Sequence, residues 1–460
     1  MYLRTLQVNR LKLLRDVKLD FTDVDGQSIR KWTVIIGKNG TGKTSLLQAA
    51  ALAAAGGLQV NTLAGRSVGH LRDRRTSEPL QVTATFEFFD PERGNELHPL
   101  IRGAIPEPLQ LTSETSLKEG ETSLRSTSRY SNLHKKIDDP LDDARSRNMH
   151  RWFVAGYGVA RTMSDIGRSP TLDRPSIERM LSLFDPGVPL IATNFASYFS
   201  NYPGTLKAEV FDRVLRLALL NAASLLPDIV GFELNGSITR PGDLQERQMF
   251  LQQVGAQGPM QVPVAALAHG YHSTIAWLAD LVGHVLLEAK TQVEPDDMAG
   301  VVLVDEIDSY LHPLWQATII PALRATFPKM QFIATTHSPV VLSGVAPHEI
   351  VRLASWGTEG DVLEVVHHPE TGELVPASEC REKGIRPDAR MMTGSEIFRE
   401  HFGVESPTPN PHGDELRRFT LLASDPFRTV DEHQEMLRLR RQLISYEFTE
   451  LPSPVRRKKQ

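Results

Sequence analysis

Apolar residues near the N-terminus follow strand-like patterns. Tyr2–Val8 and Val17–Phe21 are predicted as two strands, and Leu80–Phe89 alternates as a half-buried strand does. Between them, Trp32–Ile36 is an uninterrupted β-branched and apolar run, which is typical of a strand buried on both faces. The helix-forming stretch Ser45–Ala50 follows it closely. The first 90 residues therefore predict an α/β arrangement.

The middle of the chain changes pattern twice. Residues 111 to 132 are polar and rich in Ser and Thr, with few core residues, and predict a mobile surface loop. Helical periodicity from 175 to 228 predicts an inserted helical lobe. Residues 231 to 264 are β-like and interrupted by glycines.

A second block of strands and helices runs from residue 267 to 344. It contains the predicted strands Val301–Val304 and Gln331–Thr336 and the predicted helix Trp315–Phe327. Beyond it we expect a β-hairpin over Val351–His367, followed by helices over Ser395–Phe402 and Asp431–Leu443. The predicted divisions are 1–90 and 262–350 for the two halves of one α/β head, 91–261 for an insertion, and 351–460 for a C-terminal extension.

Composition limits the class of protein. The 460 residues are 40% hydrophobic and 23% charged, as in soluble globular proteins, and allow one long domain with an insertion or two to three smaller domains. The one cysteine, Cys380, excludes an internal disulfide and a four-cysteine zinc site, and fits a cytoplasmic protein. We find neither a signal peptide nor an apolar run of the ~18 residues that a membrane span needs.

Net charge argues against a protein that coats nucleic acid, because the chain carries −5 at pH 7. Basic residues nevertheless gather in places, either as solvated surface or as contacts for DNA. The clusters are Arg66, His70, Arg72, Arg74 and Arg75; Arg125 to Arg151, with Lys135, Lys136, Arg145 and Arg147; and the C-terminal Arg456, Arg457, Lys458 and Lys459.

The most specific motif is GKNGTGKT at Gly37–Thr44, between the strand at Trp32–Ile36 and the following helix. Glycines let such a loop turn its backbone N–H groups toward an anion, and the helix N-terminus adds positive potential. Lys43 can then reach the β- and γ-phosphates, and the Thr44 hydroxyl can hold Mg²⁺. The predicted nucleotide contacts here are Gly37, Asn39, Gly40, Gly42, Lys43, Thr44 and Ser45.

Two later strands end in residues that complement this loop. Asp305 and Glu306 follow the apolar run Val301–Val304, and we expect Asp305 to bind Mg²⁺ and Glu306 to polarise an attacking water as general base. His337 follows the next strand, in position to contact the γ-phosphate and that water. A third loop, Ala266–Ser273, opens a helix and forms another potential anion site.

Taken in order, these motifs resemble the ABC-type ATPase family. The chain is most similar to its RecF/SMC-like branch and to ATP-binding proteins found with bacterial anti-phage defence systems such as Septu. Gly37–Thr44 matches Walker A, Val301–Glu306 matches Walker B, and His337 matches the switch histidine. Leu267–His272 lies at the position of the signature motif, and Asp308–Pro313 at that of the D-loop.

The resemblance implies an α/β fold: an ABC-type head of mixed sheet and antiparallel β subdomain, with a helical insertion and tail. It also implies ATP and Mg²⁺ as ligands and a head-to-tail dimer or higher oligomer. The Gly270 N–H and the Ser273 hydroxyl would then face the γ-phosphate bound by the partner.

Several positions depart from the family pattern. Ala268 replaces the signature serine and His312 replaces the D-loop aspartate, so we expect slow hydrolysis. Gln59 and Gln81 are both candidates for the Q-loop glutamine, although Gln81 fits a strand interior better. Arg161 is either a phosphate contact or a structural arginine.

Three uses of such an ATPase remain open. The first is a DNA-linked or defence ATPase that controls a partner effector such as a nuclease, with RecF-type DNA repair as a variant. The second is the cytosolic subunit of a transporter, against which the long insertion and the helical tail argue. The third is a fused TOPRIM nuclease, for which Glu359–Asp361 is a poor match; we interpret it as a hairpin turn and place any nuclease in another protein.

Overall fold

A computed structural model of the chain contains two compact units, Met1–Met391 and Met392–Gln460, and each is considered by itself. Cys380 and Glu359–Asp361 lie outside the residues that the structure describes. The described residues are 1–89, 101, 105–133, 137–162, 178–191, 207–220, 226, 228–234, 248–253, 258–263, 266–289, 293, 295–353, 365–367, 374–376, 388–402, 412–446 and 451–456.

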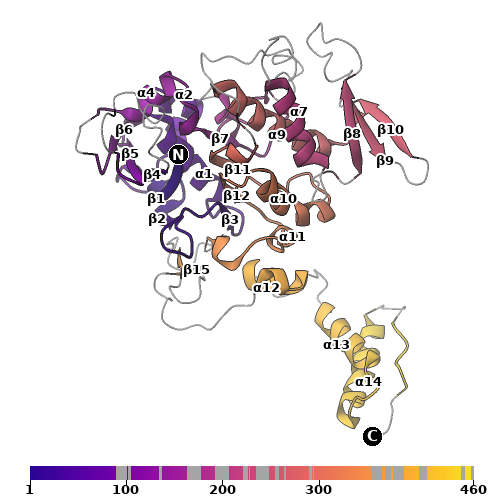
Figure 1. The fold of residues 1–460 in the computed structure, drawn as a ribbon. Helices are drawn as coiled ribbons and strands as arrows, with labels where there is room; N and C mark the ends of the chain where they lie inside the picture. The colour runs from indigo at the N-terminus through magenta and orange to yellow at the C-terminus, as the bar shows by residue number, and fades with distance from the viewer. Residues whose placement is uncertain are drawn as a thin grey trace. The chain divides into compact units, whose positions relative to one another are not determined.

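A five-stranded parallel sheet carries the phosphate loop, in the order β13–β3–β12–β11–β7 (Figure 1). Its strands are β3 (Trp32–Ile36), β7 (Val154–Tyr157), β11 (Gly300–Val304), β12 (Met330–Thr335) and β13 (Ile350–Arg352). Because parallel strands end at the same edge of a sheet, the loops after β3, β11 and β12 meet there. This edge is where the predicted site residues gather.

A second five-stranded sheet is antiparallel, in the order β2–β1–β4–β5–β6. Its strands are β1 (Tyr2–Leu11), β2 (Leu14–Asp20), β4 (Leu80–Phe88), β5 (Leu109–Leu117) and β6 (Arg125–Tyr130). Together the two sheets confirm the predicted α/β class, with a phosphate-loop sheet and an antiparallel β subdomain.

The mobile loop predicted over residues 111 to 132 is wrong, because β5 and β6 occupy most of it. Leu111, Ser113 and Thr115 point inward along β5 while their neighbours are more exposed, so the segment alternates as a strand does. Small hydroxyl side chains take inward positions that we expected only apolar residues to fill. Because these inward residues are polar, composition did not reveal the two-residue alternation of the strand.

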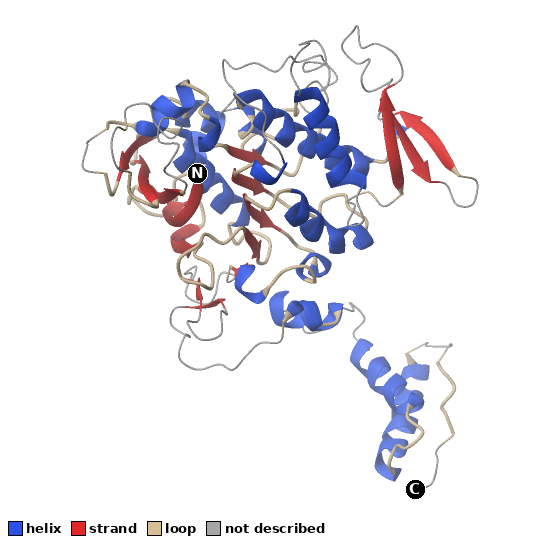
Figure 2. Cartoon of the chain, viewed as in Figure 1, coloured by secondary structure: helices blue, strands red, loops and turns tan. Residues whose placement is uncertain are grey.

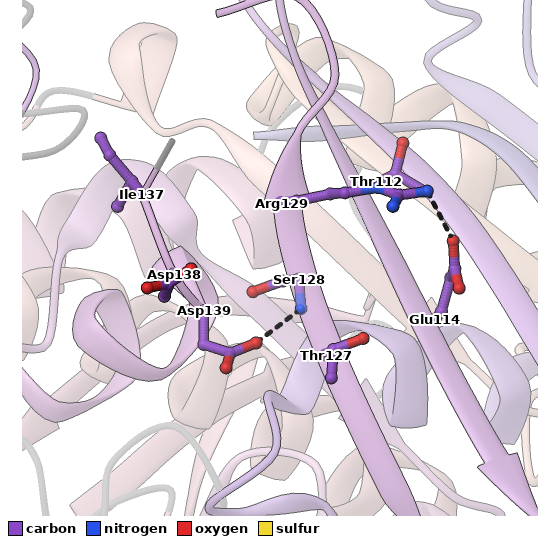
Figure 3. A pocket seen from close by; sticks show the side chains of 8 residues that line it. All are labelled: Thr112, Glu114, Thr127, Ser128, Arg129, Ile137, Asp138 and Asp139. Carbon is purple, nitrogen blue, oxygen red and sulfur yellow. Dashed lines mark hydrogen bonds and ion pairs between the residues drawn. The ribbon is translucent and has the colours of Figure 1, made fainter. Parts of the chain in front are cut away.

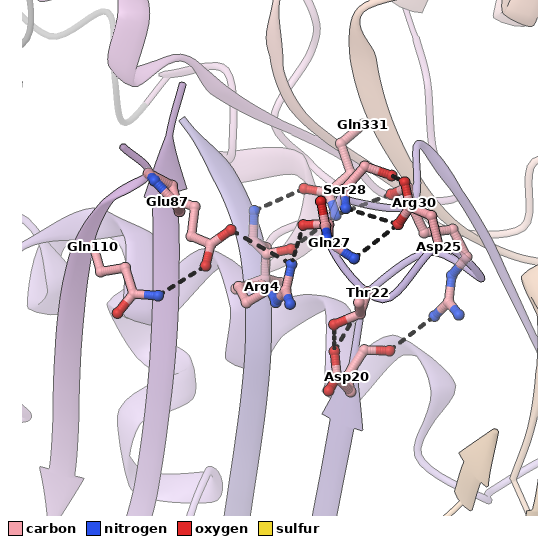
Figure 4. A network of polar contacts seen from close by, with 12 residues as sticks. Arg4, Asp20, Thr22, Asp25, Gln27, Ser28, Arg30, Glu87, Gln110 and Gln331 are labelled. Atoms are coloured by element: carbon pink, nitrogen blue, oxygen red, sulfur yellow. Dashed lines mark hydrogen bonds and ion pairs between the residues drawn. The ribbon is translucent and has the colours of Figure 1, made fainter. Parts of the chain in front are cut away.

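Helix α1 (Lys43–Ala55) lies between the two sheets and is buried on all sides (Figure 1). Its run of alanines suits this position, because small side chains let both sheets approach closely. A polar network also joins the sheets (Figure 4). Gln331 of β12 exchanges hydrogen bonds with the backbone of Leu3 in β1, and the buried Arg30 donates to Asp20 O at the end of β2.

The remaining elements of the first unit include a helical pair and two small sheets (Figure 2). Within the described residues, helical periodicity before 228 is confirmed by α7, and the β-like stretch before 264 by the sheet β10–β9–β8. The elements are α2 (Val60–Ala64), η1 (Gly65–His70), α4 (Pro140–Ser146), η3 (His150–Trp152), η4 (Leu181–Leu183), α7 (Lys207–Leu220), β8 (Ile229–Leu234), β9 (Gln248–Gln253), β10 (Pro259–Pro263), α9 (His269–Glu288), η7 (Pro295–Asp297), α10 (Pro313–Thr326), α11 (Pro339–Leu342), η8 (Pro347–Glu349), β14 (Val365–His367), β15 (Leu374–Pro376) and η9 (Ala389–Met391).

The hairpin predicted over Val351–His367 is also wrong. Its first part belongs to β13, which pairs with β3 in the parallel sheet, and its last residues form β14, which pairs with β15. A short apolar strand does not reveal its partner, and the nearest strand in sequence is not the one that β13 pairs with.

The second unit is helical. Its elements are α12 (Gly394–Phe402), α13 (Gly413–Ser424) and α14 (Val430–Ser445). Helices α12 and α14 confirm the two predicted in the extension, whereas α13 was not predicted. Among the described residues of the whole chain, no helix combines the length and apolarity of a membrane span.

A buried polar group at α9 makes stability depend on pH. His284 lies 3.6 Å from Asp280 and is 1% exposed, and burial, with the charge of Arg179, holds its pKa well below the usual 6.5. The unfolded chain therefore binds a proton at His284 that the folded chain does not, once the pH falls below 6.5. The stability gained from the neutral ring is complete above that pH and is lost progressively below it.

We expect the free energy of unfolding to fall between about pH 6.5 and 5, and His284→Gln to flatten that fall. Urea unfolding at several pH values measures it. The control is His70→Gln, which removes an exposed histidine of η1. Parallel pH curves for wild type and His284→Gln would contradict the assignment.

Candidate functional site

The phosphate loop has the conformation that its glycines were expected to permit. Gly40 and Gly42 have φ values of +81° and +97°, in the left-handed region that other residues rarely adopt. A Cβ at Gly42 would lie 2.5 Å from Leu14 Cδ2, so a side chain would also collide there. Asn39 is exposed in the loop and Ser45 is buried in the first turn of α1.

Lys43 lies inside the loop. Its Nζ donates to Gly37 O at 2.9 Å and to Lys38 O at 3.1 Å, and the residue is only 7% exposed. Burial lowers the pKa of Lys43, while the negative charges of Asp305 and Glu306 oppose that shift. The loop therefore encloses an ammonium group that faces the acidic strand end.

Asp305 joins the phosphate loop to the strand ends. Its Oδ2 accepts from Thr44 Oγ1 at 2.8 Å, and its Oδ1 accepts from Thr335 Oγ1 at 2.6 Å. Thr44 and Asp305 are 261 residues apart in sequence, and only the parallel sheet brings them together. Thr335 was not predicted as a site residue, although its position at the end of β12 was an available signal.

The donor atoms around Asp305 fit Mg²⁺. A hydroxyl and a carboxylate beside a phosphate loop are the hard oxygen ligands that Mg²⁺ prefers, with substrate phosphates and water as its other ligands. Such a site needs only one or two carboxylates. Among the described residues there is no group of three or more His, Cys, Asp or Glu that could hold a metal ion.

Glu306 lies in a strained turn that its neighbours stabilise. Its φ is +44°, and its N–H donates to Thr335 Oγ1 at 2.7 Å. One carboxylate oxygen accepts from Ser309 Oγ at 2.7 Å. The carboxylate therefore has a fixed orientation, and its contact with Ser309 was not predicted from the sequence.

The sequence allowed two interpretations of Arg161, as a phosphate contact or as a structural arginine. Its contacts in the structure favour the second. Arg161 is 3% exposed, and its guanidinium donates to the backbone oxygens of Asp305 and Glu306 and to Gly158 O. Burial lowers its pKa to about 10, so it is charged at neutral pH. Arg161 stabilises the left-handed turn and places a positive charge under the acid pair.

His337 follows β12 and is half-buried at the same edge of the sheet. Burial and the charge of Lys43 lower its pKa, so the ring is neutral at pH 7. A neutral imidazole can donate one hydrogen bond and accept another. Ser338 caps α11 and also donates to Gln316 Oε1, which fixes the chain after His337.

The signature region differs from expectation. Ser273 is 1% exposed, and its Oγ has no hydrogen-bond partner among the described residues, so the hydroxyl is enclosed within the single chain. Gly270 packs against the D-loop, where an added Cβ would lie 2.2 Å from Tyr310 O. Close packing within one subunit therefore explains the glycine.

His312, at the D-loop aspartate position, caps α10. Its Nδ1 accepts from Leu314 N at 3.3 Å, as an aspartate carboxylate does at many helix N-termini. Gln59 precedes α2 and Gln81 lies inside β4. Neither of the glutamines proposed for the Q-loop is therefore at the strand ends that carry Asp305, Glu306 and His337.

The basic cluster around η1 is partly structural. Arg72 donates to the backbone oxygens of Asp73, Thr76 and Glu78, and Arg75 forms two hydrogen bonds with the Asp73 carboxylate. Arg66 and Arg74 are exposed. In the second cluster, Arg145 is buried and donates to Ala54 O and Trp152 O.

A separate pocket of about 200 Å³ lies on β5 and β6 (Figure 3). Three of its charged groups have identified partners: Arg129 pairs with Glu114 at 3.0 Å, and Asp139 accepts from Ser128 N at 2.8 Å. It contains none of the residues predicted to bind nucleotide, and no function follows from it.

Comparisons with known proteins agree with the geometry of the phosphate-loop site. The family model described as "AAA domain, putative AbiEii toxin, Type IV TA system" matches residues 32–98 and 274–343, which include the phosphate loop, the acid pair and His337.

Two relatives extend the match. Septu protein PtuA of Bacillus mycoides is 23% identical over 97% of this chain and 51% of its own length, so the chain spans about half of that protein. A retron Vc95 probable ATPase of Vibrio cholerae is 22% identical over 72% of this chain and 70% of its own length. A solved SMC head bound to the C-winged helix domain of ScpA has a TM-score of 0.47 and 15% identity, covering 82% of this chain and 99% of that one.

The geometry of the phosphate loop and the acid pair agrees with the matches to the family model and to the two relatives. The chain is thus similar to Septu protein PtuA and to the retron probable ATPases, and its phosphate loop and acid pair have the arrangement of a P-loop nucleotide-binding site.

Proposed function

We propose that the chain binds ATP with Mg²⁺ at the phosphate loop and hydrolyses it slowly between two subunits arranged head to tail. The observation that supports this most is the Thr44–Asp305 hydrogen bond, which joins the loop to the acidic strand end. Lys43 contacts the β- and γ-phosphates, and Thr44 and Asp305 hold Mg²⁺. The metal neutralises charge on the phosphate oxygens.

Glu306 is the proposed general base. It orients a water beside the γ-phosphorus and accepts a proton from it while the oxygen of that water bonds to phosphorus. The bond between the γ-phosphorus and the bridging oxygen breaks, and ADP and phosphate are released. The neutral His337 donates a hydrogen bond to the γ-phosphate.

An exposed face beside the signature loop supports the head-to-tail arrangement. Ala268 and His269 are exposed at the start of α9, next to Tyr310, which is 50% exposed, and Leu314, which is 72% exposed. His269 and Tyr310 contact each other edge to face, with ring centroids 4.4 Å apart. A second subunit would cover this face while it completes the nucleotide site.

If two subunits share each site, phosphate release per chain rises with protein concentration until the dimer is saturated. Leu314→Arg should shift this rise to a concentration roughly tenfold higher, which corresponds to ~1.4 kcal/mol of weaker association. Leu58→Arg is the matched control, because Leu58 is 76% exposed and lies between α1 and α2. Activity per chain that is independent of concentration would rule out the shared site.

We propose that the output is control of a partner effector, such as a nuclease, in anti-phage defence. Support comes from the names of the relatives, Septu protein PtuA and retron probable ATPase. RecF-type DNA repair and a transporter subunit are the competing uses. Sedimentation with membranes would favour the transporter, and a nuclease gene next to this one would favour defence.

DNA is a candidate signal for this ATPase, through Arg66 and Arg74. We expect Arg66→Glu with Arg74→Glu to weaken binding of duplex DNA and to reduce its salt dependence, by about one unit of slope for each phosphate that the variant no longer neutralises. The control with equal charge change is Lys18→Glu with Lys118→Glu, two exposed lysines outside the basic clusters. If wild type shows no salt-dependent binding, the signal is not DNA bound by this chain.

A further inference from the structure

The second unit exposes an unusual share of apolar side chains. Of the fifteen large hydrophobic residues exposed among the described residues, seven lie within Met392–Gln460. Scattered exposed residues need no explanation, but a concentration of them marks an interaction surface. They are Leu421, Phe427, Val430, Leu437, Ile444, Tyr446 and Val455.

The hairpin of α13 and α14 has its own small core, on a different face. Phe419 and Leu422 pack against Met436, Leu439 and Leu443. A core of this size stabilises a small unit only modestly. Covering a further apolar surface would therefore add to the stability of the hairpin.

Three of the exposed residues form one stripe on α14. Val430, Leu437 and Ile444 are 54%, 40% and 56% exposed, and each lies seven residues from the next. Seven residues are close to two turns of an α-helix, so the three side chains lie in a row. We refer to them as the α14 stripe.

Arginines flank the α14 stripe. Arg440 and Arg441 lie three and four residues after Leu437, on either side of the row. No ion pair between described residues uses either of them, and the Nε of Arg440 is buried with no hydrogen-bond partner among those residues.

α14 has three acidic residues, of which Asp431 lies in its first turn next to Val430 and the other two have partners away from Leu437 and Ile444. Glu435 pairs with Arg418 of α13 at 2.9 Å, and Glu432 forms a capping box with Thr429. The stripe is thus apolar with basic edges, which is complementary to an apolar row with acidic edges.

We propose that the α14 stripe docks an amphipathic helix of another protein whose apolar row is flanked by Asp or Glu. A second copy of α14 does not provide those charges. In antiparallel pairing centred on Leu437, Arg441 would face His433, and in parallel pairing Arg440 and Arg441 would face themselves. The proposal does not depend on the nucleotide site, so the two can fail separately.

Two synthetic helical peptides test the proposal by fluorescence anisotropy with the full chain. Both carry leucines in a heptad row of about three turns or more. One has glutamates beside the row and the other has lysines at the same positions. We expect the acidic peptide to bind at least roughly tenfold more tightly than the basic one. Added salt should reduce the difference in affinity between the two peptides.

Leu437→Gln should weaken binding of the acidic peptide by about tenfold, and Arg440→Gln with Arg441→Gln should remove most of the preference for acidic flanks. The matched control is Leu421→Gln, which changes a residue 61% exposed on α13, outside the stripe. Equal binding of both peptides, no binding, or no effect of Leu437→Gln would overturn the proposal.

Two further measurements identify other occupants of the stripe. If Leu437→Gln dissociates an oligomer of the full chain in light scattering, a second copy covers the stripe and the proposal is wrong. If Leu437→Gln lowers the melting temperature and Leu421→Gln does not, the chain covers its own stripe, which also overturns the proposal.

Discussion

Lys43→Ala removes ATP binding. The ammonium group lies inside the phosphate loop, where it contacts the β- and γ-phosphates in the proposed complex. Removing one partner of such a charge pair costs ~2–5 kcal/mol, so affinity should fall by roughly thirtyfold to a few thousandfold. Isothermal titration calorimetry with ATP and Mg²⁺ measures the change.

The control is Lys38→Ala in the same loop. Lys38 is exposed, and the atom it contributes to the loop is its backbone oxygen, which the substitution keeps. Its ATP affinity should stay within about threefold of wild type, less than ~1 kcal/mol. Full binding by Lys43→Ala, with an unchanged melting temperature, would show that the nucleotide binds elsewhere.

Glu306→Gln leaves ATP binding intact and slows hydrolysis by ~10²–10⁴, the range that general-base catalysis contributes. The amide has the size of the carboxylate and can still accept from Ser309 Oγ, so the turn is retained. Because ATP is bound but not cleaved, the variant should accumulate as the closed, ATP-dependent oligomer. Phosphate release and size-exclusion chromatography with light scattering follow the two effects.

Glu114→Gln on β5 makes the same change of charge at an exposed position and should leave the rate unchanged. Hydrolysis at the wild-type rate by Glu306→Gln would remove Glu306 from the mechanism. Loss of ATP binding would instead show that the substitution disturbs the turn that Arg161 and Thr335 hold.

Strand ends with specific chemistry were predictable from sequence. Trp32–Ile36 is continuous and apolar and leads into a loop whose glycines allow few other conformations, so both the strand and the loop were predicted correctly. Val301–Val304 and Gln331–Thr336 were also predicted as strands that end in site residues. In the structure they belong to β11 and β12, which pair with each other, and β12 also pairs with β3.

Segments with weak composition signals were not predictable. β5 hides its alternation because Ser113 and Thr115 occupy inward positions, and β7 is only four residues long. The pairing of β13 with β3 is a contact between distant segments, and no local pattern encodes it.

The sequence by itself determined the chemistry of the nucleotide site, because Lys43, Thr44, Asp305 and Glu306 stand in motifs whose spacing and flanking strands are local properties. Only the tertiary structure decided what surrounds them. Thr335 and Arg161 support the acid pair, Ser273 is enclosed, and Gly270 packs on Tyr310. These are contacts between residues far apart in sequence, which form when sheets and helices pack and leave no period or motif along the chain.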